Sequence, residues 1–167
     1  MRLSRALLIA AAVAVADQLA KAWIVATRPF GSETEVIPGL FRIVHTRNRG
    51  IAFGLFGASG AAVQLGLLVA VAAIVAVVAW QLSRTGGDGL AGWGLALVLG
   101  GAIGNIVDRV ARGEVVDFLD FYLRIGGREH HWFAFNLADS AISVGACMVV
   151  LGELVSQTRS KRAPGTD

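Results

Sequence analysis

The chain has 167 residues, of which 55% are hydrophobic and only 16% are charged, and its formal net charge is +3. Its mean hydropathy is +0.64. Soluble domains carry about 25% charged residues, so this composition excludes a soluble, disordered or nucleic-acid-binding chain. The single cysteine, Cys147, excludes an internal disulfide. We therefore expect an integral membrane protein with one domain.

Four stretches are long and apolar enough to cross a bilayer, which takes roughly 20 residues of helix. They cover residues 6–26, 61–82, 90–110 and 138–155. The sequence therefore predicts an all-α membrane protein with four transmembrane helices. We expect a single membrane-embedded domain over residues 1–158 and a disordered cytoplasmic tail over 159–167.

The orientation is predicted from the basic residues near the span ends, because these are enriched on the cytoplasmic side. Bare counts on the two sides do not decide, but the cluster Arg159-Ser160-Lys161-Arg162 favours a cytoplasmic C-terminus. An even number of spans then places both termini in the cytoplasm. The first stretch also resembles a cleavable signal peptide ending at Ala14-Val15-Ala16. Apolar sequence resumes after Asp17, which favours a retained span instead.

Two segments between the spans, residues 27–60 and 111–135, fall on the outer side in this topology. Both are rich in β-branched and aromatic residues, and Gly126-Gly127 is a plausible turn between extended pieces. We expect a small extracytoplasmic β-layer over the helix ends.

Ionisable side chains inside the predicted spans are the first candidates for function, because each costs roughly 2.5–3.5 kcal/mol at a helix centre. Asp17 and Lys21 are four residues apart, so they share a helix face and can pair. A snorkelling lysine with its counter-ion is the alternative. In the third span Asn105, Asp108 and Arg109 form one polar stripe. We expect these side chains to find partners on other elements.

Two further acids approach the outer surface from different elements. Asp139 lies in the first turn of the fourth span, which Asn136 can cap. Asp117 stands in the apolar run Val115–Leu119, and Asp120 is predicted to be a solvated charge on the opposite side of an extended strand. Spacing alone does not show that Asp117 and Asp139 meet. If they do, the pKa of one carboxyl rises, and the pair can activate water against a peptide bond.

Other chemistries have weaker support. Cys147 lies among apolar residues and is predicted to be an inert core thiol. His130 and His131 are adjacent, but no metal-binding spacing accompanies them, so no metal and no cofactor is expected. Intramembrane acids also mark ion pathways, so a small proton- or ion-coupled transporter component is an alternative. A structural membrane protein whose polar stripes join helices is another.

The chain resembles the lipoprotein signal peptidase (signal peptidase II) family, which are membrane aspartic proteases of bacteria. Five motifs carry the resemblance in the order in which the family has them: DQLAK at Asp17–Lys21, NRGIAF at Asn48–Phe53, GAIGNIVDR at Gly101–Arg109, GEVVDF at Gly113–Phe118 and FNLADS at Phe135–Ser140. Ala20 stands where the family usually has a hydroxyl residue.

The resemblance implies that Asp117 and Asp139 are a catalytic dyad. It implies a diacylglyceryl-modified prolipoprotein as substrate, cut on the amino side of the lipidated cysteine, and inhibition by cyclic peptide antibiotics. We expect the following residues to bind substrate or to support the site: Asn105, Arg109, Asn136, Asn48, Asp108, Asp17 and Lys21. The expected protein is a monomer of the bacterial inner membrane, surrounded by lipid, with its active site near the extracytoplasmic face.

Overall fold

The structure is a computed structural model that describes residues 3–48, 61–85 and 89–162. Its helices are α1 (Leu3–Thr27), α2 (Ala61–Thr85), α3 (Gly89–Arg112) and α4 (Leu137–Arg162). Its strands are β1 (Glu33–Ile37), β2 (Phe41–Asn48), β3 (Val115–Ile125) and β4 (Arg128–His131). Each predicted span therefore falls on a helix. Helix α4 runs through residues 159–162, which were predicted to be tail, and residues 163–167 lie outside the described part of the chain.

Three of the described helices, α1, α3 and α4, are long and apolar enough to cross a membrane. Helix α2 is also strongly apolar in sequence, and among its described residues the apolar stretch covers Leu68–Arg84. The chain is thus a multi-pass membrane protein, and the described residues do not confirm the fourth span.

Helix α3 packs closely against both α1 and α4 because glycines line its two contact faces. A Cβ atom on Gly100 would lie 2.5 Å from the backbone oxygen of Ala10 in α1. A Cβ atom on Gly101 would lie 2.4 Å from the backbone oxygen of Ala138 in α4. Only glycine allows such contacts between helix backbones. The close packing brings the polar stripe of α3 against both neighbouring helices.

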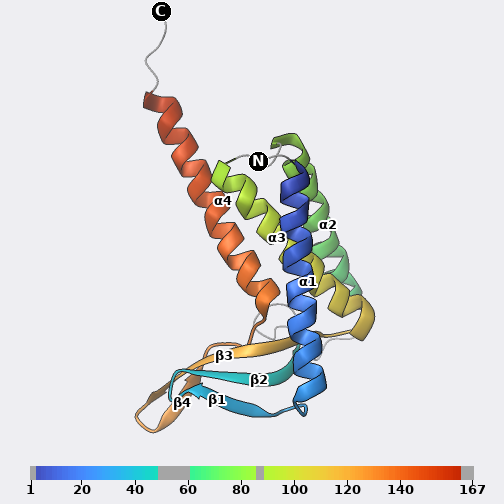
Figure 1. Cartoon of the computed structure of the whole chain (residues 1–167), viewed down its shortest axis with the longest axis vertical. Coiled ribbons are helices and arrows are strands. Elements are labelled where there is room, and N and C mark those ends of the chain that lie inside the picture. Colours follow the sequence, from blue (N-terminus) through green and yellow to red (C-terminus); the bar gives the residue numbers. More distant parts are fainter. Residues whose placement is uncertain (1–2, 49–60, 86–88, 163–167) are drawn as a thin grey trace, which may run out of the picture.

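The four strands form one antiparallel sheet in the order β1-β2-β3-β4. Gly126 and Gly127 both have positive φ angles, 59° and 78°, and form the predicted turn between β3 and β4. The sheet lies across one end of the helices, while α1 begins and α4 ends at the opposite end (Figure 1). The predicted small β-layer over the helix ends is confirmed.

Two side chains differ from their predicted surroundings. Asp120 was predicted to be solvated, but it is buried, since Arg42 of β2 and His131 of β4 both reach it. Alternation does place it on the face of β3 opposite Asp117, yet the side chains of Arg42 and His131 shield it from solvent there. Cys147 was predicted to be a core thiol, but it lies on an exposed surface of α4.

Candidate active site

The centre of the site is a buried cluster of charges around Lys21. The side chains of Lys21, Asp17 and Asp108 are wholly buried. The ammonium nitrogen lies within hydrogen-bonding distance of three oxygens: Oδ2 of Asp17 at 2.7 Å, Oδ2 of Asp108 at 2.9 Å and Oδ1 of Asn105 at 3.0 Å. The predicted pairing of Asp17 with Lys21 is confirmed. An ammonium has three N–H donors, so there is one oxygen acceptor for each of them.

The two carboxylates of this cluster also hold the ends of other elements. The backbone N–H of Ala138, in the first turn of α4, donates to Oδ1 of Asp17 (2.9 Å). The backbone N–H of Val116 in β3 donates to Oδ2 of Asp108 (3.2 Å). Each side chain thereby satisfies a buried backbone donor. The cluster fastens α1 and α3 to the start of α4 and to β3, the two elements that carry the candidate dyad.

The carboxylate of Asp139 accepts hydrogen bonds from Asn105 and from Asn136, the residue just before helix α4. The Nδ2 group of Asn105 donates to Oδ1 of Asp139 (2.8 Å), and the backbone N–H of Asn136 lies 3.3 Å from Oδ2. Oδ1 of Asn136 in turn accepts from the backbone N–H of Asp139 (2.9 Å). Asn136 is therefore the predicted N-cap of α4.

Asn136 also contacts Asp117, the other acid of the candidate dyad. Its Nδ2 group donates to Oδ1 of Asp117 (2.7 Å), and the carboxylate of Asp117 takes a further hydrogen bond from the side chain of Asn48. One asparagine thus contacts both Asp117 and Asp139, which are 22 residues apart in sequence. The three asparagines of the chain, Asn48, Asn105 and Asn136, all lie at this site.

Both acids line one cavity of about 510 Å³ between the sheet and the ends of α3 and α4. Arg109 lines it too, and its guanidinium interacts electrostatically with both carboxylates. Apolar and aromatic side chains, including Trp132 and Phe133, form much of the remaining wall. The cavity therefore combines a few polar groups with an apolar lining, as binding sites do.

The environment of Asp117 favours its protonated form. Burial, together with the negative charge of Asp139, raises the pKa of this carboxyl to about 7, even though the hydrogen bonds from Asn136 and Asn48 lower it. Two acids in one partly dry cavity do not both ionise easily. A carboxyl that holds a proton near neutral pH beside a second carboxylate is the arrangement that acid–base chemistry requires.

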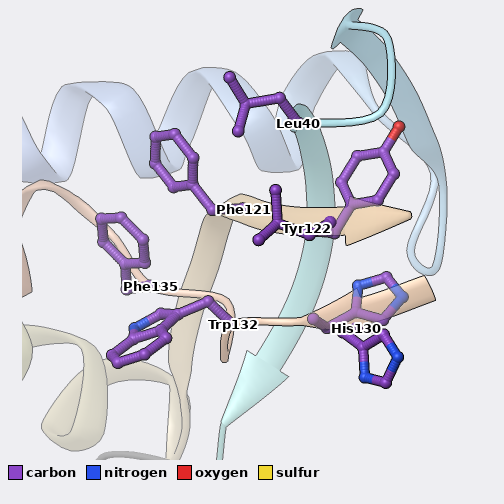
Figure 2. Close-up of a pocket in the computed structure, with 8 residues that line it drawn as sticks. Leu40, Phe121, Tyr122, His130, Trp132 and Phe135 are labelled. Atoms are coloured by element: carbon purple, nitrogen blue, oxygen red, sulfur yellow. The ribbon is translucent and has the colours of Figure 1, made fainter. Parts of the chain in front are cut away.

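A second hollow lies beside this cavity on the sheet. It has a volume of about 560 Å³, and Figure 2 shows the aromatic side chains of Phe121, Tyr122, Trp132 and Phe135 around it. Trp132 and Phe135 line both spaces. The two hollows are therefore neighbours with a largely apolar wall in common.

The structure thus places all nine predicted site residues around this cavity or in the charged cluster beside it. Sequence reasoning missed two members of the cluster. Gln18 donates to Oδ1 of Asp108 (3.1 Å), and Arg112 forms an ion pair with the same carboxylate. The spacing of Arg112, four residues after Asp108, could have predicted its pairing. The remaining motif positions 49–53 lie outside the described residues. Among the described residues no group of three His, Cys, Asp or Glu side chains is arranged to hold a metal ion.

Comparison with known proteins gives a consistent result. The sequence model of the family "Signal peptidase (SPase) II" matches residues 9–155. The lipoprotein signal peptidase of Solibacter usitatus is 42% identical over 148 residues, which is 86% of each chain. That of Oleidesulfovibrio alaskensis is 45% identical over 146 residues, 86% of this chain and 90% of the relative.

Two solved structures of bacterial membrane enzymes have the same fold. One has a TM-score of 0.74 at 27% identity and covers 98% of this chain and 95% of its own. The other has a TM-score of 0.69 at 31% identity and covers 90% and 93%. Fold, cavity and sequence together define a membrane-bound protease. The chain belongs to the signal peptidase II family.

Proposed function

We propose that the protein is an aspartic endopeptidase that removes the signal peptide from prolipoproteins whose lipobox cysteine carries diacylglycerol. The observation that carries this proposal is the convergence of Asp117 and Asp139 on one partly apolar cavity, where Asp117 has a pKa of about 7. The cut falls on the amino side of the lipidated cysteine.

In this mechanism the two carboxyl groups share one proton. One carboxylate takes a proton from water while the water oxygen attacks the scissile carbonyl carbon, and the other carboxyl gives its proton to the carbonyl oxygen. The tetrahedral intermediate then collapses: the C–N bond breaks, the proton taken from water passes to the departing amine nitrogen, and the hydroxyl formed from the carbonyl returns its proton to the other carboxylate. No covalent intermediate with the enzyme forms. Arg109, which lines the cavity and interacts with both acids, would stabilise the negative charge that develops on that oxygen.

The remaining predicted residues act through the dyad. Asn105 and Asn136 each donate to one of the two acids, and Asn48 supports Asp117. Asp17, Lys21 and Asp108 are buried beneath them and hold the elements in place. The positions of the two carboxyl groups therefore depend on side chains that take no part in the reaction.

The apolar walls fit a lipid-modified substrate. The cavity and the neighbouring hollow share Trp132 and Phe135, so an apolar group can lie against both. We place the sheet at the extracytoplasmic surface of the bacterial inner membrane, with four spans and both termini in the cytoplasm. The enzyme acts as a monomer, and cyclic peptide antibiotics would occupy the same cavity.

Cleavage of a diacylated prolipoprotein by the purified protein in detergent tests the function. The expected product is a signal peptide that ends one residue before the lipidated cysteine, identified by mass spectrometry. The matched control is the same prolipoprotein without diacylglycerol, which we expect to remain uncut. Equal cleavage of both forms would contradict the proposed substrate class, and no cleavage of either would contradict the proposed activity.

A further inference from the structure

The buried ammonium of Lys21 has a geometric consequence for the dyad. Lys21 can only donate hydrogen bonds, because an ammonium has no lone pair. It lies 3.0 Å from one end of the Asn105 amide, so that end must be the oxygen, Oδ1. The other end of the amide is then the donor Nδ2, which lies 2.8 Å from Oδ1 of Asp139. The orientation of this amide is fixed by chemistry as well as by packing.

The second amide at the site is fixed in the same way. Oδ1 of Asn136 accepts from the backbone N–H of Asp139, which can only donate. Its Nδ2 group must therefore point the other way, toward Asp117 and toward Oδ1 of Asn105 (3.3 Å). Asn105 Oδ1 thus accepts from both Lys21 and Asn136. No second orientation of the Asn105 amide satisfies these neighbours.

The charges that face Asp139 come from every element around it. Asp117 lies on β3, Arg109 on α3, and Asp17 and Lys21 on α1. Both oxygens of Asp139 accept from N–H groups that cannot accept in return, Nδ2 of Asn105 and the backbone of Asn136. Such donors favour an ionised carboxylate.

We propose that Lys21 is a positioning residue of the peptidase: its ammonium orients the Asn105 amide so that Asp139 enters the reaction ionised and takes the proton from water. This inference rests on the proposed function. The O–H bond of water breaks, its proton goes to the carboxylate of Asp139, and the proton for the carbonyl oxygen comes from Asp117. Lys21 itself touches neither substrate nor reacting atoms.

The test needs a variant that removes Lys21 without leaving an unpaired buried charge, since such a charge strongly destabilises a fold. The double variant Asp17→Asn/Lys21→Met removes one negative and one positive charge together. The Asp108–Arg112 pair remains. The single variant Asp17→Asn is the reference, because it differs from the double variant only in Lys21.

The orientation itself can be measured without any enzyme assay. The chain has three asparagines, so protein labelled with ¹⁵N in asparagine side chains gives three pairs of amide signals in detergent micelles. Asp17→Asn adds a fourth pair, present in both variants. Loss of Lys21 is expected to shift the Asn105 signals and to speed their proton exchange, while those of Asn48 stay in place. Unchanged Asn105 signals would overturn the proposed orienting contact, whatever reaction the protein catalyses.

Kinetics of the same two variants test the consequence for the reaction. Relative to Asp17→Asn, the double variant is expected to lose about 10- to 100-fold in kcat with KM unchanged, as when an outer partner of a functional group is removed. A purely structural role would lower the folded fraction and leave kcat of the folded protein unaltered. A rise in KM at constant kcat would also overturn the proposal.

A double-mutant cycle with Asn105→Ala tests whether the effect passes through the amide. Without an amide to orient, loss of Lys21 is expected to cause no further decrease in the single-turnover rate. A decrease of the same size in this background would overturn the inference. Failure of the proposed function is recognised separately, because then the unaltered protein cleaves no prolipoprotein while the amide signals still report on Lys21.

Discussion

Asp117 is the side chain whose chemistry depends most on its surroundings. The residue is 3% exposed, and the pKa of its carboxyl is raised, mainly by burial, from an ordinary value of 3.8 to about 7. A group whose pKa is higher in the folded state favours folding when protonated. That contribution is complete below its unfolded pKa and is lost as the pH rises through the folded value. Asp117 therefore weakens the fold at neutral and alkaline pH while it serves the reaction.

Replacing this acid by its neutral isostere should separate stability from activity. We expect Asp117→Asn to lose most of its turnover and yet to be more stable than the unaltered protein at about pH 8, by at most about 4 kcal/mol. At about pH 4 the two should unfold at similar temperatures, because Asp117 is then largely protonated in the folded protein. Thermal unfolding in detergent at both pH values measures this. If Asp117→Asn were less stable than the unaltered protein at both pH values, the proposed destabilisation by the buried, ionised Asp117 would be contradicted.

Which side chains form the site could be predicted from the sequence to different degrees. The pairing of Asp17 with Lys21 follows from helical spacing, and Asn136 as a cap follows from its place before an apolar run. Burial of Asp120 could not be predicted, because it depends on the register that sets Arg42 opposite it. The contact of Lys21 with Asn105 joins residues 84 apart, and local spacing carries no information about it.

Helix α3 is the element on which the other parts of the site depend. It contacts α1 through Gly100 and α4 through Gly101, and it carries Asn105 about one turn and Asp108 about two turns further on. A small residue at each contact point lets three helices approach closely enough for their polar groups to meet. The polar network and the glycine contacts therefore depend on one another.

Substitution of Gly101 tests this dependence. A Cβ atom there would lie 2.4 Å from a backbone oxygen, which cannot move aside as a flexible side chain can. We expect Gly101→Ala to lower the free energy of unfolding by about 1–3 kcal/mol. The matched control is Gly66→Ala in α2, where a Cβ atom meets nothing within 4 Å and alanine is the better helix former. Equal unfolding temperatures for both variants would contradict the proposed close packing.

The helices and the strands differ in how well the sequence predicted them. Each predicted span falls on a helix because an apolar run about 20 residues long has few other folds in lipid. The helices extend beyond the predicted spans. Helix α4, for example, continues to Arg162, past the end of the apolar run at residue 155. Strand order could not be predicted, since pairing of β2 with β3 joins segments separated by two helices.

The molecule as a whole consists of helices that meet a sheet at one end, with the site at the junction (Figure 1). Its two acids come from different layers, Asp117 from the sheet and Asp139 from the helices. Neither layer alone contains both members of the dyad. The buried cluster around Lys21 connects the layers, because its carboxylates bind backbone groups of both β3 and α4. The proposed chemistry is therefore a property of the folded chain as a whole.

Turnover of a diacylated prolipoprotein by three neutralised variants tests the central claim most directly. Asp117→Asn and Asp139→Asn should each lower kcat by about 10²- to 10⁴-fold, the usual contribution of a general acid or base. Asp120→Asn, a buried acid on the same strand but outside the cavity, should keep turnover close to that of the unaltered protein. All three should elute as folded protein from size-exclusion chromatography. Full turnover by a folded Asp117→Asn or Asp139→Asn variant would contradict the paired-aspartate mechanism.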